Sequence, residues 1–187
     1  MRIFVDIDDT IVNTVSAWIK WLNADYGLDV KIEDVKEWDM YKAFPMLAKE
    51  DVYAPLFDEV FWETVEAFSD AVGVLERLNK KHEVFLVSAT HPSNVSNKVL
   101  RCVHRHFPYI TSKQYIFIYY KSFLNGDIII DDRPENLIYS SCKYKFLMNA
   151  QHNQNFDCRN TDVEWAKDWN WIEKRIELIE KWKGDKE

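Results

Sequence analysis

Five short runs of apolar, β-branched or aromatic residues divide the chain, and most lack the polar–apolar alternation of a half-exposed strand. These runs cover residues 2–5, 83–87, 115–119, 127–130 and 144–148. Segments with helical spacing lie between them, and a closing amphipathic helix is predicted from about Val163 to Trp182. Because buried strands alternate with helices, the pattern predicts an α/β fold with a parallel five-stranded sheet flanked by helices.

The stretch from about residue 14 to 70 breaks this alternation, since it contains helical segments and no convincing strand. Residues 12–26 carry four apolar side chains at helical spacing, and residues 52–65 hold a second apolar cluster. Such a stretch is too long for a simple crossover between strands. We therefore expect a single domain over residues 1–187, with a core of 1–13 and 71–187 and a small helical cap of about 14–70 inserted after the first strand.

Composition narrows the class of partner. The chain has 187 residues, of which 47% are hydrophobic and 29% charged, the balance of a globular protein in water. A formal net charge of −7 argues against a nucleic-acid polymer as partner, and no apolar run is long enough to indicate a membrane partner. Three cysteines without metal-finger spacing indicate free thiols and a cytoplasmic location. The abundance of aromatic residues is compatible with a homodimer.

The first apolar run ends in a pair of carboxylates. Asp6 and Asp8 are two apart at the end of an extended segment, so their side chains point the same way. Two carboxylates this close repel each other unless a cation or a shared proton offsets the charge. Acidic turn residues after a strand are common, however, and this pair alone leaves the structural and the functional interpretation equally open.

Three later features favour the functional interpretation, because each follows a predicted strand. Ser88 supplies a hydroxyl, Lys121 supplies a cation that could neutralise phosphate oxygens, and Asp131-Asp132 form a second acidic pair. The carboxyl ends of parallel strands meet at one edge of the sheet, where active sites of such folds lie. Hard oxygen ligands with room for water and phosphate suit magnesium. The sequence therefore predicts a magnesium and phosphate site at this edge.

The order Asp6-x-Asp8-x-Thr10, Ser88, Lys121, Asp131-Asp132 resembles the haloacid-dehalogenase superfamily. Within it, the segments 130–134 (Ile-Asp-Asp-Arg-Pro), 150–153 (Ala-Gln-His-Asn) and 165–169 (Trp-Ala-Lys-Asp-Trp) are similar to the 5′(3′)-deoxyribonucleotidases, the cytosolic type C nucleotidase family. Together these matches cover nearly the whole chain outside the cap. The resemblance implies a Rossmann-like core and a phosphatase activity.

Carried over residue by residue, the resemblance implies a role for each motif position. Asp6 is the nucleophile that forms an aspartyl-phosphate, and Asp8 is the acid that protonates the leaving oxygen and then the base that activates water. Phosphate would be held by Thr10, Ser88 and Lys121. Mg²⁺ would be bound by the Asp6 carboxylate, the Asp8 backbone carbonyl and Asp132, with Asp131 outside the metal's coordination shell and orienting Lys121.

The chain departs from the family pattern at two positions. Asp9 stands where the family usually has glycine, which adds a charge near the metal, and Thr14 aligns with an aromatic residue that contacts the base in family members. Aromatic residues elsewhere in the predicted cap could instead provide the stacking surface or simply form the core of the cap. These residues are Trp38, Tyr41, Phe44 and Trp62.

The expected function is magnesium-dependent hydrolysis of a small phosphomonoester, with (deoxy)ribonucleoside monophosphates as the substrate that the resemblance implies. Two alternatives remain open: a phosphatase for another small phosphomonoester such as a sugar phosphate, and an inactive relative that works as a nucleotide-binding or scaffold protein. A signalling receiver domain also uses an acidic pair, a phosphorylated aspartate and a lysine. In a receiver domain, however, these residues follow a different order along the chain, and this difference excludes the receiver class.

Overall fold

The computed structural model describes residues 1–184 and contains one parallel sheet of six strands in the order β3-β2-β1-β4-β5-β6. The strands are β1 (Arg2–Asp6), β2 (Glu83–Ser88), β3 (Tyr115–Phe117), β4 (Ile128–Asp131), β5 (Tyr144–Met148) and β6 (Val163–Ala166). The predicted α/β class and parallel sheet are confirmed. β3 is two residues shorter than the run that predicted it.

The prediction of five strands was wrong, because the segment expected to begin the closing helix forms β6. Val163 and Ala166 are buried, and β6 pairs in parallel with β5 from Lys145↔Val163 to Met148↔Ala166. The helix begins only at Trp169, where the Asp168 side chain accepts a hydrogen bond from the Trp171 N–H at 2.7 Å. A capping aspartate next to the last strand residues thus separates two elements that share a continuous apolar pattern.

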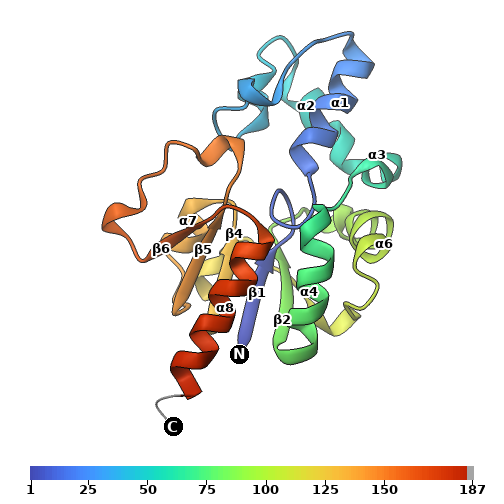
Figure 1. Ribbon diagram of the computed structural model, residues 1–187. Helices are drawn as coiled ribbons and strands as arrows, with labels where there is room; N and C mark the ends of the chain where they lie inside the picture. The colour runs from blue at the N-terminus through green and yellow to red at the C-terminus, as the bar shows by residue number, and fades with distance from the viewer. Residues whose placement is uncertain (185–187) are drawn as a thin grey trace.

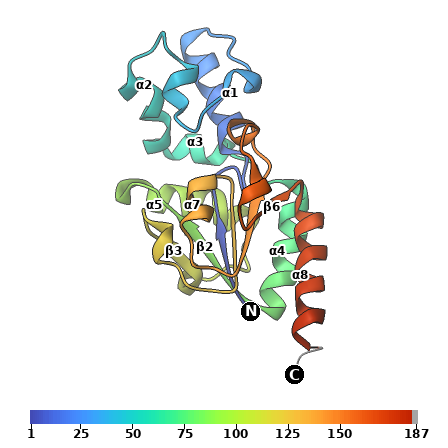
Figure 2. The ribbon, with the colours of Figure 1, turned by 90° about the vertical axis from the view of Figure 1, so that its left-hand side faces the viewer.

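The helices occupy three positions around the sheet (Figures 1 and 2). They are α1 (Thr14–Tyr26), α2 (Lys49–Tyr53), α3 (Glu59–Thr64), α4 (Ser69–Lys81), α5 (Val95–Asn97), α6 (His104–His106), α7 (Pro134–Ile138) and α8 (Trp169–Gly184), with a π-helical turn (Lys98–Val103) that joins α5 to α6. Helices α4 and α8 lie side by side on one face and α7 lies on the other, while α1, α2 and α3 gather beyond the carboxyl edge. We call residues 14–64 the helical cap. Among the described residues, none of these helices could cross a membrane.

The strands are buried on both faces, as their continuous apolar sequences predict. Along β1, Ile3 and Val5 belong to the larger hydrophobic cluster, which includes α4 and α8, whereas Phe4 belongs to the smaller cluster on the side of α7. Both faces of the sheet therefore hold β1 rigidly in place at its centre. This rigidity matters because Asp6 is the last residue of the strand.

Strand β1 also marks the point at which the chain reverses its direction across the sheet. The chain runs from β1 to β2 and β3 on one side, and then returns to β4 on the other side of β1. Open parallel sheets leave a crevice at such a point, outside the carboxyl ends of the two strands. Asp6 and Asp131 end the two strands that border this crevice.

The loop after β1 is fixed by the C-terminal helix as well as by its own backbone. The N–H groups of Ile11 and Val12 donate to the Ile7 carbonyl at 3.0 and 3.2 Å. The fully buried indole of Trp169 donates from Nε1 to the Thr10 carbonyl at 2.8 Å. A residue 159 positions away in the chain thus holds the loop that carries the candidate catalytic carboxylates.

We expect Trp169→Phe to lower the free energy of unfolding by about 1–3 kcal/mol, because it leaves the buried Thr10 carbonyl without its donor. Thermal or urea denaturation measures the loss. Trp182→Phe is the matched control, since Trp182 lies on the same helix but is 52% exposed, and its change should stay within about 0.5 kcal/mol. Equal stabilities of the two variants would contradict this tether.

Candidate active site

Asp6 and Lys121 form the centre of the site. Asp6 ends β1, and Lys121 starts the turn that follows β3 and its short extension. The Lys121 ammonium contacts the Asp6 carboxylate and also donates to Asp131 Oδ2 at 2.6 Å. All three side chains are buried. The structure therefore brings together a cation and carboxylates from three separate segments, as the positions at strand ends predict.

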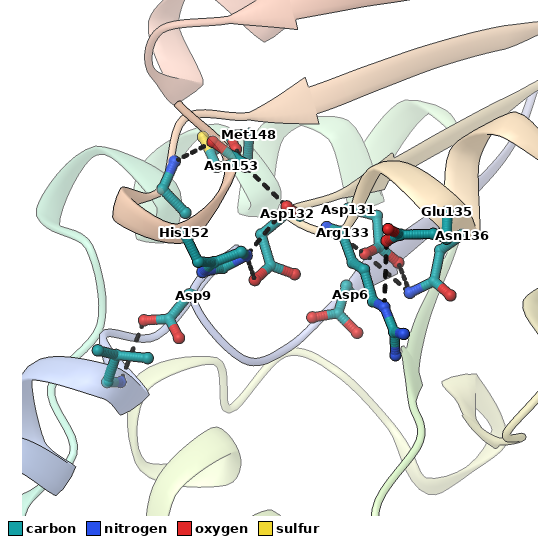
Figure 3. A network of polar contacts seen from close by, with 12 residues as sticks. Asp6, Asp9, Asp131, Asp132, Arg133, Glu135, Asn136, Met148, His152 and Asn153 are labelled. Atoms are coloured by element: carbon teal, nitrogen blue, oxygen red, sulfur yellow. Dashed lines mark hydrogen bonds and ion pairs between the residues drawn. The ribbon is translucent and has the colours of Figure 1, made fainter. Parts of the chain in front are cut away.

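Three carboxylates converge where a cation could bind. Oxygen atoms of Asp6, Asp131 and Asp132 all lie within 4.8 Å of one another. Asp131 also accepts from the Arg133 N–H at 2.9 Å and from Asn136 Nδ2 at 3.0 and 3.1 Å (Figure 3). These hydrogen bonds are made in addition to the one from Lys121. With both of its oxygens already engaged by donors, Asp131 is suited to orienting Lys121 rather than to binding a metal.

Asp132 has different partners, which come from the loop after β5. Its carboxylate lies 3.1 Å from His152 Nε2, and its backbone carbonyl accepts from Asn153 Nδ2 at 2.7 Å (Figure 3). The same Asn153 amide donates to the Met148 carbonyl at 2.8 Å, so it ties the end of β5 to Asp132. Burial opposes a charge on His152, but the hydrogen bond and charge of Asp132 raise the pKa of the imidazole above its usual value. His152 and Asn153 thus fix the position of the second acidic residue.

The electrostatics of this cluster fit a divalent cation. Burial raises the pKa of Asp6 well above its usual value, and the neighbouring carboxylates add to the effect of burial against the opposing charge of Lys121. Burial likewise raises the pKa of Asp132, against the hydrogen bond from His152. These carboxylates lack enough positive charge around them to be stably ionised. A bound cation with a preference for oxygen ligands would supply it.

Asp9 adds one more buried carboxylate, in an unusual backbone conformation. Its φ is 47°, the left-handed region that glycine, asparagine and aspartate adopt most readily. Its Oδ1 accepts from the Val15 N–H at 3.1 Å, near the start of α1. Burial and the charge of Asp132 raise the pKa of Asp9 well above its usual value. The left-handed backbone at this position explains why the family usually has glycine there. The turn does not require the carboxylate of Asp9, which adds a buried charge to the site.

Asp8 lies on the other side of the site and has its own set of partners. Thr14 Oγ1 donates to Asp8 Oδ1 at 2.8 Å, and the Lys98 ammonium contacts Asp8 Oδ2. Lys98 Nζ also donates to Ser88 Oγ at 3.0 Å. Burial alone would raise the pKa of Asp8, but the charge of Lys98 and the hydrogen bonds from Lys98 and Thr14 lower it below its usual value. Asp6 and Asp8 thus have opposite electrostatic environments although they are two residues apart.

A cleft of about 390 Å³ lies between these residues and the helical cap. Asp6, Asp8, Lys121 and Asp132 line one side of it. Large apolar and aromatic side chains line the cap side, namely Trp18, Val35, Trp38, Met40, Tyr53, Leu56, Phe57 and Trp62. A polar floor and an aromatic roof are suited to a small molecule with a charged and an apolar half.

The predicted cap residues fall into two groups. Trp38 and Trp62 line the cleft, where Arg133 Cζ lies 4.2 Å from the Trp38 ring centre and Lys98 Nζ lies 4.9 Å from that of Trp62. Phe44 is completely buried in the hydrophobic cluster, Tyr41 packs against it, and neither lines the cleft. Sequence spacing alone could not separate the two groups, because all four residues are aromatic.

The predicted phosphate-binding residues also differ in position. Ser88 ends β2 and contacts Lys98, and Lys121 lines the cleft next to Asp6. Thr10 is completely buried, and its hydroxyl has no hydrogen-bond partner within residues 1–184. Its backbone carbonyl accepts the Trp169 indole instead.

Sequence reasoning missed Lys98 and Arg133. A signal for Lys98 exists, because Asn94, Lys98 and Cys102 recur every four residues along one helical stripe and all three are buried. A lysine on an inward-facing stripe needs a buried carboxylate as partner, and Asp8 fulfils that need. Arg133 follows the acidic pair directly, but only the fold shows that it reaches Trp38 of the cap.

Comparison with known proteins agrees with this geometry. A family model described as "5' nucleotidase, deoxy (Pyrimidine), cytosolic type C protein" matches residues 1–182. The chain belongs to this family. The 5′(3′)-deoxyribonucleotidase of Clostridium acetobutylicum is 29% identical over 165 residues, which cover 88% of each chain. The resemblance to the type C nucleotidases is thereby confirmed, and the chain is an enzyme of the phosphatase class.

Solved structures of haloacid-dehalogenase-type hydrolases share the fold of this type C nucleotidase family member. One from Streptococcus pneumoniae superimposes with a TM-score of 0.68 at 12% identity, covering 94% of this chain and 97% of the other. Another from Bacillus subtilis, whose structure was determined bound to magnesium, superimposes with a TM-score of 0.60 at 12% identity, over 93% and 97%. At these identities the likeness concerns the fold alone.

Because Asp9 has a raised pKa in the folded chain, the native state holds its proton to higher pH than the unfolded state does. In that window, stability falls as pH rises. We expect Asp9→Asn, which keeps the left-handed turn, to raise the melting temperature of the metal-free protein at pH 7 by roughly 2–4 °C, about 1 kcal/mol. The gain should vanish below about pH 4, near the unfolded-state pKa.

Thermal denaturation in EDTA from pH 4 to 8 measures this difference. Asp25→Asn is the control, since it removes the same formal charge from an exposed position on α1. Added Mg²⁺ should shrink the gain of Asp9→Asn, because a bound cation offsets the charge of the cluster. A gain that is the same at every pH would contradict the electrostatic explanation.

Proposed function

We propose that this chain hydrolyses (deoxy)ribonucleoside monophosphates with the help of Mg²⁺, through an aspartyl-phosphate on Asp6. One observation carries the proposal: Asp6 lies in direct contact with the Lys121 ammonium at the floor of a cleft whose opposite wall is aromatic. A carboxylate can attack a negatively charged phosphoryl group only if cations screen their repulsion. Family membership supports the assignment.

Asp6 and Asp132 would hold Mg²⁺, with the backbone carbonyl of Asp8 as the third ligand that the family resemblance implies. The closeness of the Asp6, Asp131 and Asp132 oxygens and the raised pKa values of Asp6 and Asp132 support a cation at this point. When bound, the metal would neutralise phosphoryl oxygens and fix the geometry of attack. The magnesium in the Bacillus subtilis hydrolase is consistent with this choice of ion.

In the first chemical step, a carboxylate oxygen of Asp6 attacks phosphorus, the ester bond to the sugar oxygen breaks, and Asp8 gives its proton to that oxygen. In the second step, water attacks the aspartyl-phosphate, Asp8 takes its proton, and inorganic phosphate leaves. Lys98 lowers the pKa of Asp8, which suits the second step, while the negative charge of an arriving phosphoryl group opposes that effect and suits the first. Lys121 lines the cleft next to Asp6 and is assigned to phosphate binding, whereas Ser88 and the completely buried Thr10 do not line the cleft.

The aromatic cap favours a nucleotide over a sugar phosphate as substrate. Trp38 presents a half-exposed indole in the cleft, and Trp18, Tyr53 and Phe57 line the same wall. A nucleobase gains stacking energy on such a wall, whereas a sugar ring gains much less. The sugar-phosphate phosphatase remains the second candidate, because the phosphoryl end of the cleft would serve both.

Asp6→Asn should lower phosphate release by at least about 10³-fold, because an amide cannot form the acyl phosphate. Release of phosphate from a panel of 5′- and 3′-nucleoside monophosphates and sugar phosphates, with Mg²⁺ and with EDTA, measures this. Asp25→Asn provides the control for a lost surface charge. Undiminished turnover in Asp6→Asn would sink the mechanism, and a wild-type preference for sugar phosphates would select the second candidate.

Trp38→Ala should raise KM for a nucleoside monophosphate roughly 2- to 12-fold through the loss of about 0.5–1.5 kcal/mol of stacking. KM for a phosphate ester without an aromatic group, such as glycerol phosphate, should change much less. Trp182→Ala is a matched control because both indoles are 52% exposed and both have an arginine over the ring, at 4.2 and 5.2 Å. Equal changes of KM for the two substrates would argue against a base on Trp38.

A further inference from the structure

Lys98 is a second buried lysine at the site, separate from the one that contacts the nucleophile. It lies at the start of the π-helical turn (Lys98–Val103), and its side chain is 3% exposed. Its ammonium contacts Asp8 and Ser88, whereas Lys121 contacts Asp6 and Asp131. The two lysines thus divide the site between them, one on each carboxylate of the first motif. Segments of π-helix occur frequently at functional sites.

The carboxylate of Asp8 is held at both of its oxygens. Thr14 holds Oδ1 from the first turn of α1, and Lys98 holds Oδ2 from the helix after β2. Because these donors come from two different elements, neither side-chain torsion of Asp8 can change without breaking a contact. A group that transfers a proton must be kept within about 0.5 Å of its productive position. The geometry supplies this constraint for Asp8.

The cap contributes to the position of Lys98. The Trp62 ring of α3 lies 4.9 Å from the ammonium, and its indole N–H donates to the Leu56 carbonyl at 2.8 Å, which fixes the plane of the ring. A cation that is removed from water gains more from an aromatic face than an exposed one does. Trp62 is therefore the third side chain in contact with the ammonium, in addition to Asp8 and Ser88.

We propose that Lys98 is a positioning residue that fixes the carboxylate of Asp8 for proton transfer to the leaving oxygen, and that Trp62 of the cap holds Lys98 in place. The inference rests on the proposed function. The proton that reaches the leaving oxygen comes from Asp8 as the ester bond breaks. Replacement of Lys98 should therefore lower kcat/KM only for substrates whose leaving group needs that proton.

The experiment compares two leaving groups by kcat/KM, which reports the steps up to departure of the leaving group. A nucleoside monophosphate releases an alkoxide that must be protonated, whereas p-nitrophenyl phosphate releases a stable anion. Lys98→Met should lower kcat/KM for the nucleotide by roughly 10²-fold or more, the scale of general acid catalysis. For p-nitrophenyl phosphate it should remain close to the wild-type value. Trp62→Leu should show the same selectivity with a smaller loss, about tenfold.

Lys145→Met is the matched control. Lys145 is equally buried, on β5, and pairs with Asp162 at 2.8 Å without belonging to the cleft. Its loss is the same chemical change in the same chain, and it should leave the ratio of the two kcat/KM values unchanged. Lys98→Arg keeps a buried positive charge near Asp8, so it serves if Lys98→Met does not fold, and it should show the same selectivity to a lesser degree.

Equal losses for both substrates in the Lys98 variants would overturn the proposal, because they would mean that Lys98 acts on the phosphoryl group or on the fold. Unchanged kcat/KM for the nucleotide would overturn it as well. A wild-type protein that cleaves neither substrate would instead refute the proposed function. If sugar phosphates prove to be the better substrates, they replace the nucleotide as the alkyl ester in the same comparison.

Discussion

Repulsion among buried carboxylates is the constraint on which the rest of this structure depends. Asp6, Asp8, Asp9 and Asp132 line one cleft, and Asp131 lies directly behind them. Taking so many like charges out of water is costly unless each has a partner. The chain uses two buried lysines, one histidine and several backbone and amide donors for this purpose. The negative charge that these donors leave uncompensated would attract a divalent cation.

The parallel sheet makes this concentration of charge possible. Asp6 and Asp131 end neighbouring strands whose apolar side chains are packed on both faces, so the carboxylates cannot move apart to relieve their repulsion. The donors that hold them come from the turns after β3, β4 and β5 and from the helix after β2. Each of these segments continues a rigid strand. The packed core therefore keeps these charged groups at fixed positions, although their repulsion would otherwise separate them.

The sequence was sufficient to predict the residues at the strand ends and insufficient to predict what approaches from elsewhere. The sequence predicts that Asp6, Lys121 and the acidic pair lie close together, because parallel strands end at the same edge of the sheet. Lys98 lies in the middle of a helix, and only the packing of that helix against the sheet brings it to Asp8. Local pattern cannot show such a contact, since the two residues are 90 positions apart.

The same limit explains the errors in the fold and the ambiguity of the cap. The apolar spacing of 163–182 fits one helix, yet β5 offers an unpaired edge that Val163–Ala166 completes as a strand. Tertiary pairing overrides local spacing there. In the cap, Phe44 and Trp62 are both almost completely buried and belong to the same hydrophobic cluster, and only the three-dimensional structure shows that Trp62 also borders the cleft.

The contacts between tryptophans of the cap and cations of the core have a mechanical consequence. Arg133 lies over Trp38 and Lys98 over Trp62, so the cap meets charged groups with the flat faces of two indoles. The attraction of a cation to an aromatic face requires the cation to stay within about 6 Å of the ring centre. These two contacts therefore couple the cap to the chemistry of the core: a displacement of the cap that uncovers Lys98 or Arg133 loses the attraction and, at Lys98, removes one support of the Asp8 carboxylate.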